Sequence, residues 1–535
     1  MRPHAPGALT MFALVLTAAG LALSACSSPE PASTEQASTE GAATPATTAE
    51  APKAASTPKA EATPELSKLL VEPATGNVGN SFTVTTKGVL PGATVEFKWR
   101  GVEGSYVTEV IPDNVQYIER KYAPRLISLG KTVADAQGVA TLSTKVPEDH
   151  GDIHDIFAVV DGTNVARGGY SIKRTITISE SEGPIGAPIK IKITGMSSSY
   201  YQSTMAVRWD NMYTGFVSTV TTRGTAEFTI RAAGPVGDHT IQVYPASHGV
   251  PYLNSHQGPN VAIFGHLPDK FVYRVTGDNG APAGAVEWPD AARITALKAD
   301  SPRTGASAFK PAGGVSASVE PSSGRILEKV SLKVKGLPAD VPVELVWVTA
   351  RGNRASTSGW SLELVPLGAA KTGSDGSVDA RFDVPDDLGG WHTVRVLAKG
   401  AVVAEAPYYL ERSLVGVTPQ RVSAGDVVTI QLKGIGWTEL DNGIAVTYDN
   451  GFVGYACGFN SNGDITLYIT ATGGPGTHII DIYPMIYEGH PNAQVFDFAV
   501  PQLTALRDNP SLDIGYRLPV FRTAFKIVEP AVAQR

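Results

Sequence analysis

Cysteine is almost missing from this sequence, which has two cysteines, Cys26 and Cys457, among 535 residues. A disulfide framework like that of small secreted domains is therefore excluded, and the folded parts must be held by packed apolar cores. Hydrophobic residues make up 42% of the chain, which is ample for several cores at this length. We expect Cys457, in a strand-like Tyr-Ala-Cys-Gly-Phe segment, to be a buried, inert thiol.

An excess of positive charge is also lacking. Lys and Arg number 44 against 51 Asp and Glu, so the net charge is −7 and no basic stripe is present. This excludes nucleic acid as an expected partner. The sequence also has no Gly-x-Ser-x-Gly, phosphate-binding loop, His-Glu-x-x-His or Cys-x-x-Cys. These absences favour a non-enzymatic protein without a cofactor, although the carboxylates of a polysaccharide hydrolase would leave no short motif.

Only one apolar run stands out, and it lies near the N-terminus. It extends from about residue 8 to residue 23, follows Arg2, and ends in Leu-Ser-Ala-Cys at Cys26. The run is short for a membrane span and ends in small residues, which is typical of a signal peptide. With the cysteine at the cleavage position, it resembles the lipobox of bacterial lipoproteins. The resemblance implies that residues 1–25 are removed and that lipid on Cys26 anchors the chain to the outer face of the bacterial cell membrane, exposed at the cell surface or in a periplasm.

The next segment has little besides Ala, Thr, Pro, Ser and Glu. Apart from Leu66 at its end, residues 26–66 lack the large apolar side chains that would offset the entropy lost on folding. We therefore expect a disordered tether between the lipid and the rest of the chain.

Beyond residue 66 the chain repeats a pair of different modules. Val-Glu-Pro at 71–73 recurs at 319–321, and the pair Asp-Asn at 210–211 recurs at 449–450. A repeat of this length indicates tandem domains. The predicted order is module A (67–173), module B (174–278), a linker (279–315), module A′ (316–411) and module B′ (412–530).

Each module has the pattern of short strands. Ile189, Ile191 and Ile193 alternate with polar residues, which is the period of a half-buried strand, and turn residues recur about every ten positions. A helical period is recognisable only near 289–299. About 100 residues per module with this pattern predicts an all-β chain of four antiparallel β-sandwiches.

The module openings carry a family resemblance. Val-Thr-Pro at 417–419, the alternating segment 425–430 and Gly434 resemble bacterial immunoglobulin-like modules of the IPT/TIG type. The resemblance implies an immunoglobulin-like fold. Those bacterial modules also lack the cysteine pair of antibody domains.

A histidine recurs in every module, at the start of the penultimate strand: His154, His239, His392 and His478. One histidine per separate domain does not make a metal site, so we expect each to bond back to the preceding turn, and we predict no metal. The two Asp-Asn pairs predict tight hairpin turns. Calcium binding is the alternative for the second pair, because Asp441 lies eight residues upstream of it and supplies a further oxygen ligand. The acidic pairs at 148–149 and 386–387 are expected to be solvated turn residues.

Two long irregular stretches are the candidate binding surfaces. They run over 246–266 in module B and 485–517 in module B′, and loops of this length in a compact domain are often functional. Their aromatic, amide and imidazole side chains, which suit sugars or protein surfaces, are His248, Tyr252, Asn254, His256, Tyr487, His490, Asn492 and Tyr516. The alternative is that both loops only cover a sheet edge. An insertion in module A, with Tyr106, Tyr117 and Tyr122, is a further candidate for an exposed surface.

The sequence therefore predicts a surface-anchored lipoprotein whose modules bind or adhere at the cell envelope, with a glycan or protein as the ligand. Duplicated modules would raise avidity. They would equally suit a passive spacer, and an envelope hydrolase or its accessory protein is the remaining alternative.

Overall fold

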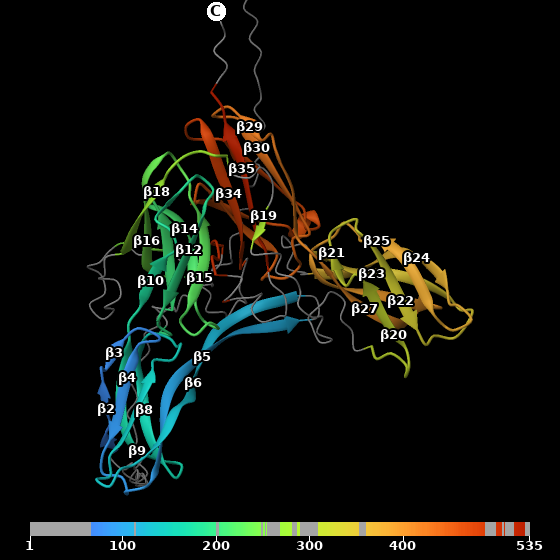
Figure 1. The fold of residues 1–535 in the computed structure, drawn as a ribbon. Coiled ribbons are helices and arrows are strands. Elements are labelled where there is room, and N and C mark those ends of the chain that lie inside the picture. The colour runs from blue at the N-terminus through green and yellow to red at the C-terminus, as the bar shows by residue number, and fades with distance from the viewer. Residues whose placement is uncertain are drawn as a thin grey trace, which may run out of the picture. The chain divides into compact units, whose positions relative to one another are not determined.

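The computed structural model describes residues 66–111, 114–199, 203–247, 250–251, 253, 268–280, 286–288, 309–352, 360–486, 499–504, 508 and 518–529 (Figure 1). Glu65–Arg535 form one compact unit. The described residues are strands and loops, apart from one short 3-10 helix, η2 (Phe459–Ser461). None of the helices in this part of the chain is long and apolar enough to cross a membrane.

Module A is a sandwich of a three-stranded sheet, β2-β4-β7, and a larger sheet, β1-β9-β8-β5-β6, to which β3 adds in parallel beside β9. Apolar side chains from both sheets, including Phe82, Trp99 and Tyr170, form its core. The strands are β1 (Ser67–Lys68), β2 (Leu70–Glu72), β3 (Thr75–Gly76), β4 (Ser81–Thr86), β5 (Thr94–Ile111), β6 (Asn114–Val133), β7 (Ala140–Lys145), β8 (Asp152–Val160) and β9 (Thr163–Ile172).

Module B repeats this plan. Its three-stranded sheet is β10-β12-β15, and its larger sheet is β11-β18-β16-β13-β14, with β17 pairing β16. The strands are β10 (Thr175–Ile178), β11 (Glu182–Gly183), β12 (Pro188–Thr194), β13 (Thr204–Trp209), β14 (Met212–Ser218), β15 (Ala226–Arg231), β16 (Gly237–Ser247), β17 (Val250–Pro251) and β18 (Asp269–Val275). The predicted alternation of Ile189, Ile191 and Ile193 is confirmed, because all three are buried on β12.

Module A′ has the sheets β20-β22-β25 and β21-β27-β26-β23-β24. Trp347 and Tyr408 lie in its core, as their counterparts Trp99 and Tyr170 do in module A. The strands are β20 (Ser316–Glu320), β21 (Ser323–Gly324), β22 (Lys329–Lys335), β23 (Pro342–Gly352), β24 (Trp360–Lys371), β25 (Val378–Asp383), β26 (Gly390–Ala398) and β27 (Ala401–Leu410).

Module B′ has the sheets β28-β30-β33 and β35-β34-β31-β32, with β29 parallel to β35. The segment before module A′ also contributes, because β19 (Val286–Trp288) pairs antiparallel with β35. The remaining strands are β28 (Ser413–Thr418), β29 (Arg421–Val422), β30 (Val427–Lys433), β31 (Gly443–Tyr448), β32 (Gly451–Cys457), β33 (Ile465–Thr470), β34 (Gly476–Met485) and β35 (Val520–Ile527).

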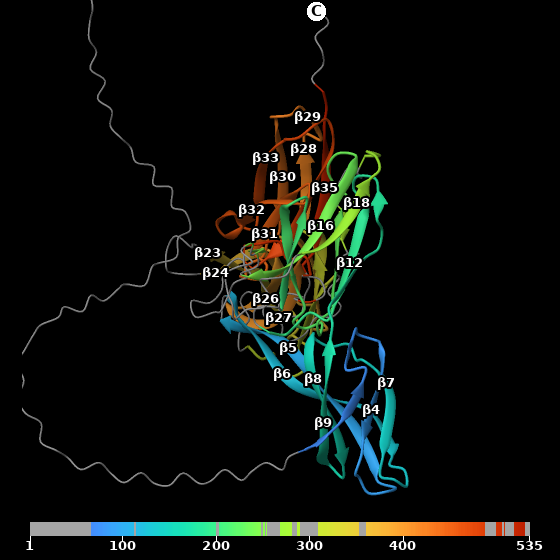
Figure 2. The same cartoon turned by 90° about the vertical axis from the view of Figure 1, so that its left-hand side faces the viewer.

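The chain is therefore all-β in its described residues, with tandem immunoglobulin-like sandwiches, and the predicted fold class is confirmed. In every module a short early strand (β3, β11, β21 or β29) pairs in parallel with the last strand of the larger sheet. The modules differ most in one hairpin. β5 and β6 pair from Thr94–Val133 out to Ile111–Asn114, and this long ribbon is visible in both views (Figures 1 and 2).

Candidate functional site

The eight predicted loop residues all lie outside the described residues: His248, Tyr252, Asn254, His256, Tyr487, His490, Asn492 and Tyr516. The structure therefore does not test them, and they stay predictions. Several neighbours in the same two loops are described, and they show what part of each loop does. In module B, residues 246–247 continue β16 and pair with β17.

The described part of the module B′ loop covers a sheet edge of module B. β14 is the outermost strand of the larger sheet in module B, and Phe216 on it forms a parallel bridge with Gln502. The Phe216 N–H donates to the Pro501 carbonyl at 2.8 Å, and the Leu503 N–H donates to the Phe216 carbonyl at 2.9 Å. For residues 499–504 the edge-covering alternative is therefore the correct one, because these backbone groups complete the ladder of β14.

A buried aspartate fixes the same loop further along. Asp508 accepts hydrogen bonds from the Tyr106 hydroxyl at 2.9 Å, from the Thr221 N–H at 2.7 Å and from the Ser218 hydroxyl. Burial, together with the charge of Asp508, raises the pKa of Tyr106 well above its usual value. A carboxylate with several donors is stable in a buried place, so Asp508 ties module B′ to modules A and B.

The tyrosines of the module A insertion do not form an exposed surface, which corrects the sequence prediction. Tyr106 and Tyr117 on the β5–β6 hairpin are buried, and Tyr122 packs against them. They belong to an apolar cluster that draws on all four modules, which we name the shared cluster. Its buried members are Tyr106, Val115, Tyr117, Val220, Leu388, Trp391, Tyr409, Trp437, Leu440, Ile486 and Leu518.

The sequence offered the insertion, with its three tyrosines, as a further candidate for an exposed surface. The structure gives the physical reason for the other outcome. The hairpin reaches the loop of module B′ that precedes β31, where the Glu439 N–H donates to the Val115 carbonyl at 3.2 Å and the Tyr117 N–H donates to the Glu439 carboxylate at 3.4 Å. The tyrosines are buried by module B′, and no local pattern in the insertion encodes that contact.

Modules B and B′ also meet through buried charges. The Arg231 guanidinium on β15 bonds the Asp481 carboxylate on β34 and donates to the Ile480 and Thr523 carbonyls at 3.0 and 2.9 Å. Arg522 on β35 lies 3.9 Å from the same carboxylate and donates to the Thr229 carbonyl at 2.6 Å. We name Arg231, Asp481 and Arg522 the ionic triad. All three side chains are buried, so each charge depends on its partners.

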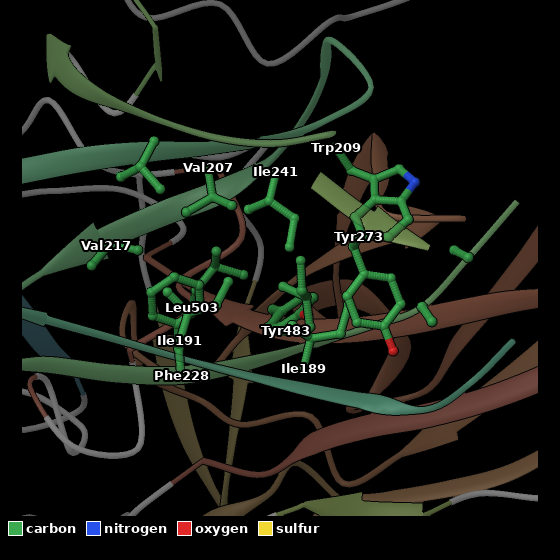
Figure 3. Close-up of a cluster of buried hydrophobic side chains, with 14 of the residues drawn as sticks. Ile189, Ile191, Val207, Trp209, Val217, Phe228, Ile241, Tyr273, Tyr483 and Leu503 are labelled. Carbon is green, nitrogen blue, oxygen red and sulfur yellow. The ribbon is translucent and has the colours of Figure 1, made fainter. Parts of the chain in front are cut away.

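Apolar contacts surround the ionic triad. The core of module B continues into side chains of module B′ (Figure 3), where Tyr483 and Leu503 lie against Ile189, Ile191 and Phe228. Burial raises the pKa of Tyr483 well above its usual value. One face of the larger sheet of module B′ is thus covered by module B.

The recurring histidines are structural, as predicted. In each case Nε2 lies within hydrogen-bond distance of the carbonyl four residues upstream, at 2.7 Å for His154 and His239, 2.6 Å for His392 and 2.9 Å for His478. In modules A and A′, Nδ1 meets a β-strand carbonyl, whereas in modules B and B′ it meets an aspartate, Asp210 or Asp449. For His478, burial lowers the pKa, but the hydrogen bond and charge of Asp449, the Gly474 carbonyl and the charge of Asp278 together outweigh it, so the net pKa is raised.

The two Asp-Asn pairs form the predicted hairpin turns. Asp210 and Asn211 have φ of 47° and 67°, and Asp449 and Asn450 have φ of 46° and 65°, as a tight two-residue turn requires. Asp441, which raised the calcium alternative, accepts instead from the Thr438 N–H at 2.8 Å. Among the described residues no group of three or more His, Cys, Asp or Glu is placed to hold a metal ion.

The acidic pairs are solvated, as predicted, only at their first members, Glu148 and Asp386, which are exposed. For the second members the prediction was wrong. Asp149 and Asp387 are buried, and each accepts a hydrogen bond from a core indole, Trp99 Nε1 at 3.0 Å and Trp347 Nε1 at 2.8 Å. A buried indole N–H needs an acceptor, and the aspartate supplies it across 50 and 40 residues of sequence. The repeat of Trp and Asp at matching positions was the signal that could have shown this. Cys457 lies on β32 and is only partly buried, so its predicted full burial is not found.

No family model matches the chain, and no curated protein matches it. Among solved structures, an alpha-2-macroglobulin from Salmonella is 11% identical over 78% of this chain and 29% of its own, with a TM-score of 0.15. The Yersinia pseudotuberculosis adhesin InvE is 11% identical over 32% of this chain and 55% of its own, with a TM-score of 0.17. The Escherichia coli adhesin FdeC is 11% identical over 64% of this chain and 96% of its own, with a TM-score of 0.15. The fold assignment rests on the strand order and register given above.

Proposed function

We propose that this chain is a lipid-anchored protein of a bacterial cell envelope, and that its modules bind an envelope glycan or protein without catalysis. The lipobox-like sequence at Cys26 supports the anchor. The observation that most supports binding is the shared cluster, which draws residues from all four modules. A spacer made of stacked repeats needs contacts only between successive modules. Here the hairpin of the first module contacts the last module, and such bracing lowers the entropic cost of presenting a binding surface.

The binding part is tested with the chain from residue 66 onward on an array of glycans and envelope components. A matched variant shortens only 254–266 and 487–498, because 499–504 and Asp508 are structural. We expect the wild type to bind at least one component. Loss of that binding in the shortened form would locate the contact in the loops. Release of reducing sugar from a polysaccharide would favour a hydrolase, and no binding at all would favour a spacer.

The anchor is tested by replacing Cys26 with Ser in the full-length chain. We expect the wild type to sediment with membranes and to incorporate labelled palmitate. Cys26→Ser is expected to lose the label and to appear in the soluble fraction, because a thioether-linked lipid cannot form on a hydroxyl side chain. Palmitate on Cys26→Ser would contradict the proposed anchor.

A further inference from the structure

β14 and β32 occupy the same place in their modules. Each is the outermost strand of the larger sheet, and each follows an Asp-Asn turn. In each pair the register also shifts at the same point, between the fourth and fifth residues of the neighbouring strand, β13 or β31. Phe216 on β14 pairs with Ala206, and Tyr455 on β32 pairs with Ala445 at the matching position. The exposure differs sharply, because Phe216 is 1% exposed and Tyr455 is 51% exposed.

The edge of β14 shows what such a strand binds. Its occupant is the uncharged segment Val-Pro-Gln-Leu-Thr at 500–504, which lies parallel to it and exchanges two backbone hydrogen bonds with Phe216. The Leu503 side chain fills a notch over Gly215. A Cβ at Gly215 would come within 2.8 Å of Leu503 Cγ and Cδ2, so only glycine leaves room for this contact.

The same notch on β32 is open. Gly454 is the counterpart of Gly215, and a Cβ built on it would meet no atom of the structure within 4 Å. Because the register matches, the Tyr455 N–H and carbonyl point away from β31, as those of Phe216 point away from β13. Within the described residues, no backbone hydrogen bond from beyond the sheet reaches Tyr455.

The composition of the edges also separates these two strands from the others. The equivalent edges of modules A and A′ carry charges or proline, such as Lys121 and Arg125 on β6 and Pro366 on β24. Such residues protect exposed edges from pairing. β14 and β32 have no charged residue and no proline along their seven residues. Because residues 500–504 cover the edge of β14, the matching composition of β32 indicates an edge that also pairs with another segment.

We propose that β32 (Gly451–Cys457) accepts an extended, uncharged peptide segment of a partner protein as an added parallel strand. An aliphatic side chain of that segment fills the notch at Gly454, and its backbone bonds Tyr455. The added strand would cover the exposed side chains of Val453 and Tyr455. This proposal deepens the proposed binding function and rests on it, since it names one surface and the chemistry of its ligand.

A second copy of this chain fits the edge less well. Its 500–504 segment is already held against its own β14. Two β32 strands related by a two-fold axis would pair antiparallel, whereas the filled counterpart is parallel. A peptide from another protein meets both requirements.

The test uses the chain from residue 66 onward and a labelled synthetic peptide, Ala-Val-Pro-Gln-Leu-Thr-Ala, which copies the occupant of β14. We expect saturable binding, measured by fluorescence anisotropy. Tyr455→Pro removes the outward N–H together with the exposed phenol ring, and neither group takes part in the pairing with β31. Val453→Lys adds a charge at a position that is 54% exposed. Each change is expected to weaken binding at least about tenfold.

Two controls accompany these variants. Leu364→Lys places the same charge on β24, at a position that is 50% exposed, and should leave binding unchanged. A peptide with Asp in place of Leu should not bind, because a carboxylate cannot fill an apolar notch. Circular dichroism checks that each variant is folded.

Three results would overturn the proposal. The first is absence of peptide binding at concentrations up to about 1 mM, and the second is unchanged binding by folded Tyr455→Pro. The third is a dimer in sedimentation that Val453→Lys abolishes, because the occupant of the edge would then be a second copy of the chain. The array described above separates this proposal from the proposed function. Array binding that survives in Tyr455→Pro, together with no peptide binding, would refute the edge site alone. Absence of array binding by the wild type would refute the proposed function.

Discussion

Modules B and B′ share one plan, and comparing them separates two kinds of residue. Both modules have a histidine that bonds an aspartate in the Asp-Asn turn, His239 with Asp210 and His478 with Asp449. At other matching positions they differ. Asp481 of the ionic triad corresponds to Gln242, which lies at the same place on β16. The histidine–aspartate pairs, which repeat, hold each module together, whereas Asp481, which does not repeat, bonds one module to the other.

The junctions between modules follow the same rule. The turn between β7 and β8 of module A contacts module B, and it has His150 directly after the buried Asp149. The equivalent turn in module A′ has Leu388 after Asp387. Both aspartates bond a core tryptophan, so that part is common. His150 and Leu388 are both buried, but Leu388 belongs to the shared cluster, and neither ring nitrogen of His150 has a hydrogen-bond partner among the described residues.

The largest effect is expected from Asp481→Ala, which removes the acidic member of the ionic triad. Arg231 and Arg522 would then be buried without a counter-charge, so we expect a loss of about 3–5 kcal/mol in the free energy of unfolding. Urea unfolding followed by tryptophan fluorescence measures it. Lys270→Ala is the control, because Lys270 takes the place of Arg522 in module B and is exposed. Equal losses in the two variants would show that the ionic triad does not hold the modules together.

Asp508→Ala tests a residue that has no counterpart in the loop of module B. The Ser218 and Tyr106 hydroxyls and the Thr221 N–H would each lose an acceptor in a buried place. We expect a loss of about 2–3 kcal/mol, measured in the same urea experiment. Tyr106→Phe removes one of these bonds and should cost less. A cost of Asp508→Ala no larger than that of Tyr106→Phe would contradict the role given to the aspartate.

The sequence predicted most of what repeats and missed the contacts between modules. Strand alternation, the Asp-Asn turns and the role of the histidines follow from patterns within one module, and all were confirmed. Tyr106 and Tyr117 were predicted to be exposed. Their burial could not be seen in the local sequence, because it depends on residues more than 300 positions away. Asp149 was also misassigned, although its bond to Trp99 lies within one module. The candidate loop residues gave no repeated pattern that would fix their neighbours.

His150→Leu makes the junction of modules A and B resemble that of A′ and B′. Burial lowers the pKa of His150, although the charge of Asp149 opposes this. The folded pKa lies below the unfolded value near 6.5. The contribution of His150 to the free energy of unfolding is therefore complete above about pH 6.5 and falls as the pH drops toward the folded pKa. His150→Leu should remove that fall and add about 1 kcal/mol at pH 5. Thermal unfolding at pH 5 and pH 8 measures it, and a variant less stable than wild type at both values would show that the imidazole is needed there.

The smallest effect is expected from His478→Gln within module B′, and its dependence on pH is opposite to that of the His150 contribution. The pKa of His478 is raised, so its contribution is full below the unfolded value near 6.5 and is lost as the pH rises through the folded pKa. The variant should therefore lose more stability at pH 5.5 than at pH 8.5, by roughly 0.5 kcal/mol for a partly screened pair. Asp449→Asn removes the charge that Nδ1 meets at 2.6 Å and should reproduce the same pH-dependent part of the loss. If the two variants instead gave opposite dependences on pH, the histidine and aspartate would not act as a pair, and the common plan of the two modules would rest on the shape of the turn alone.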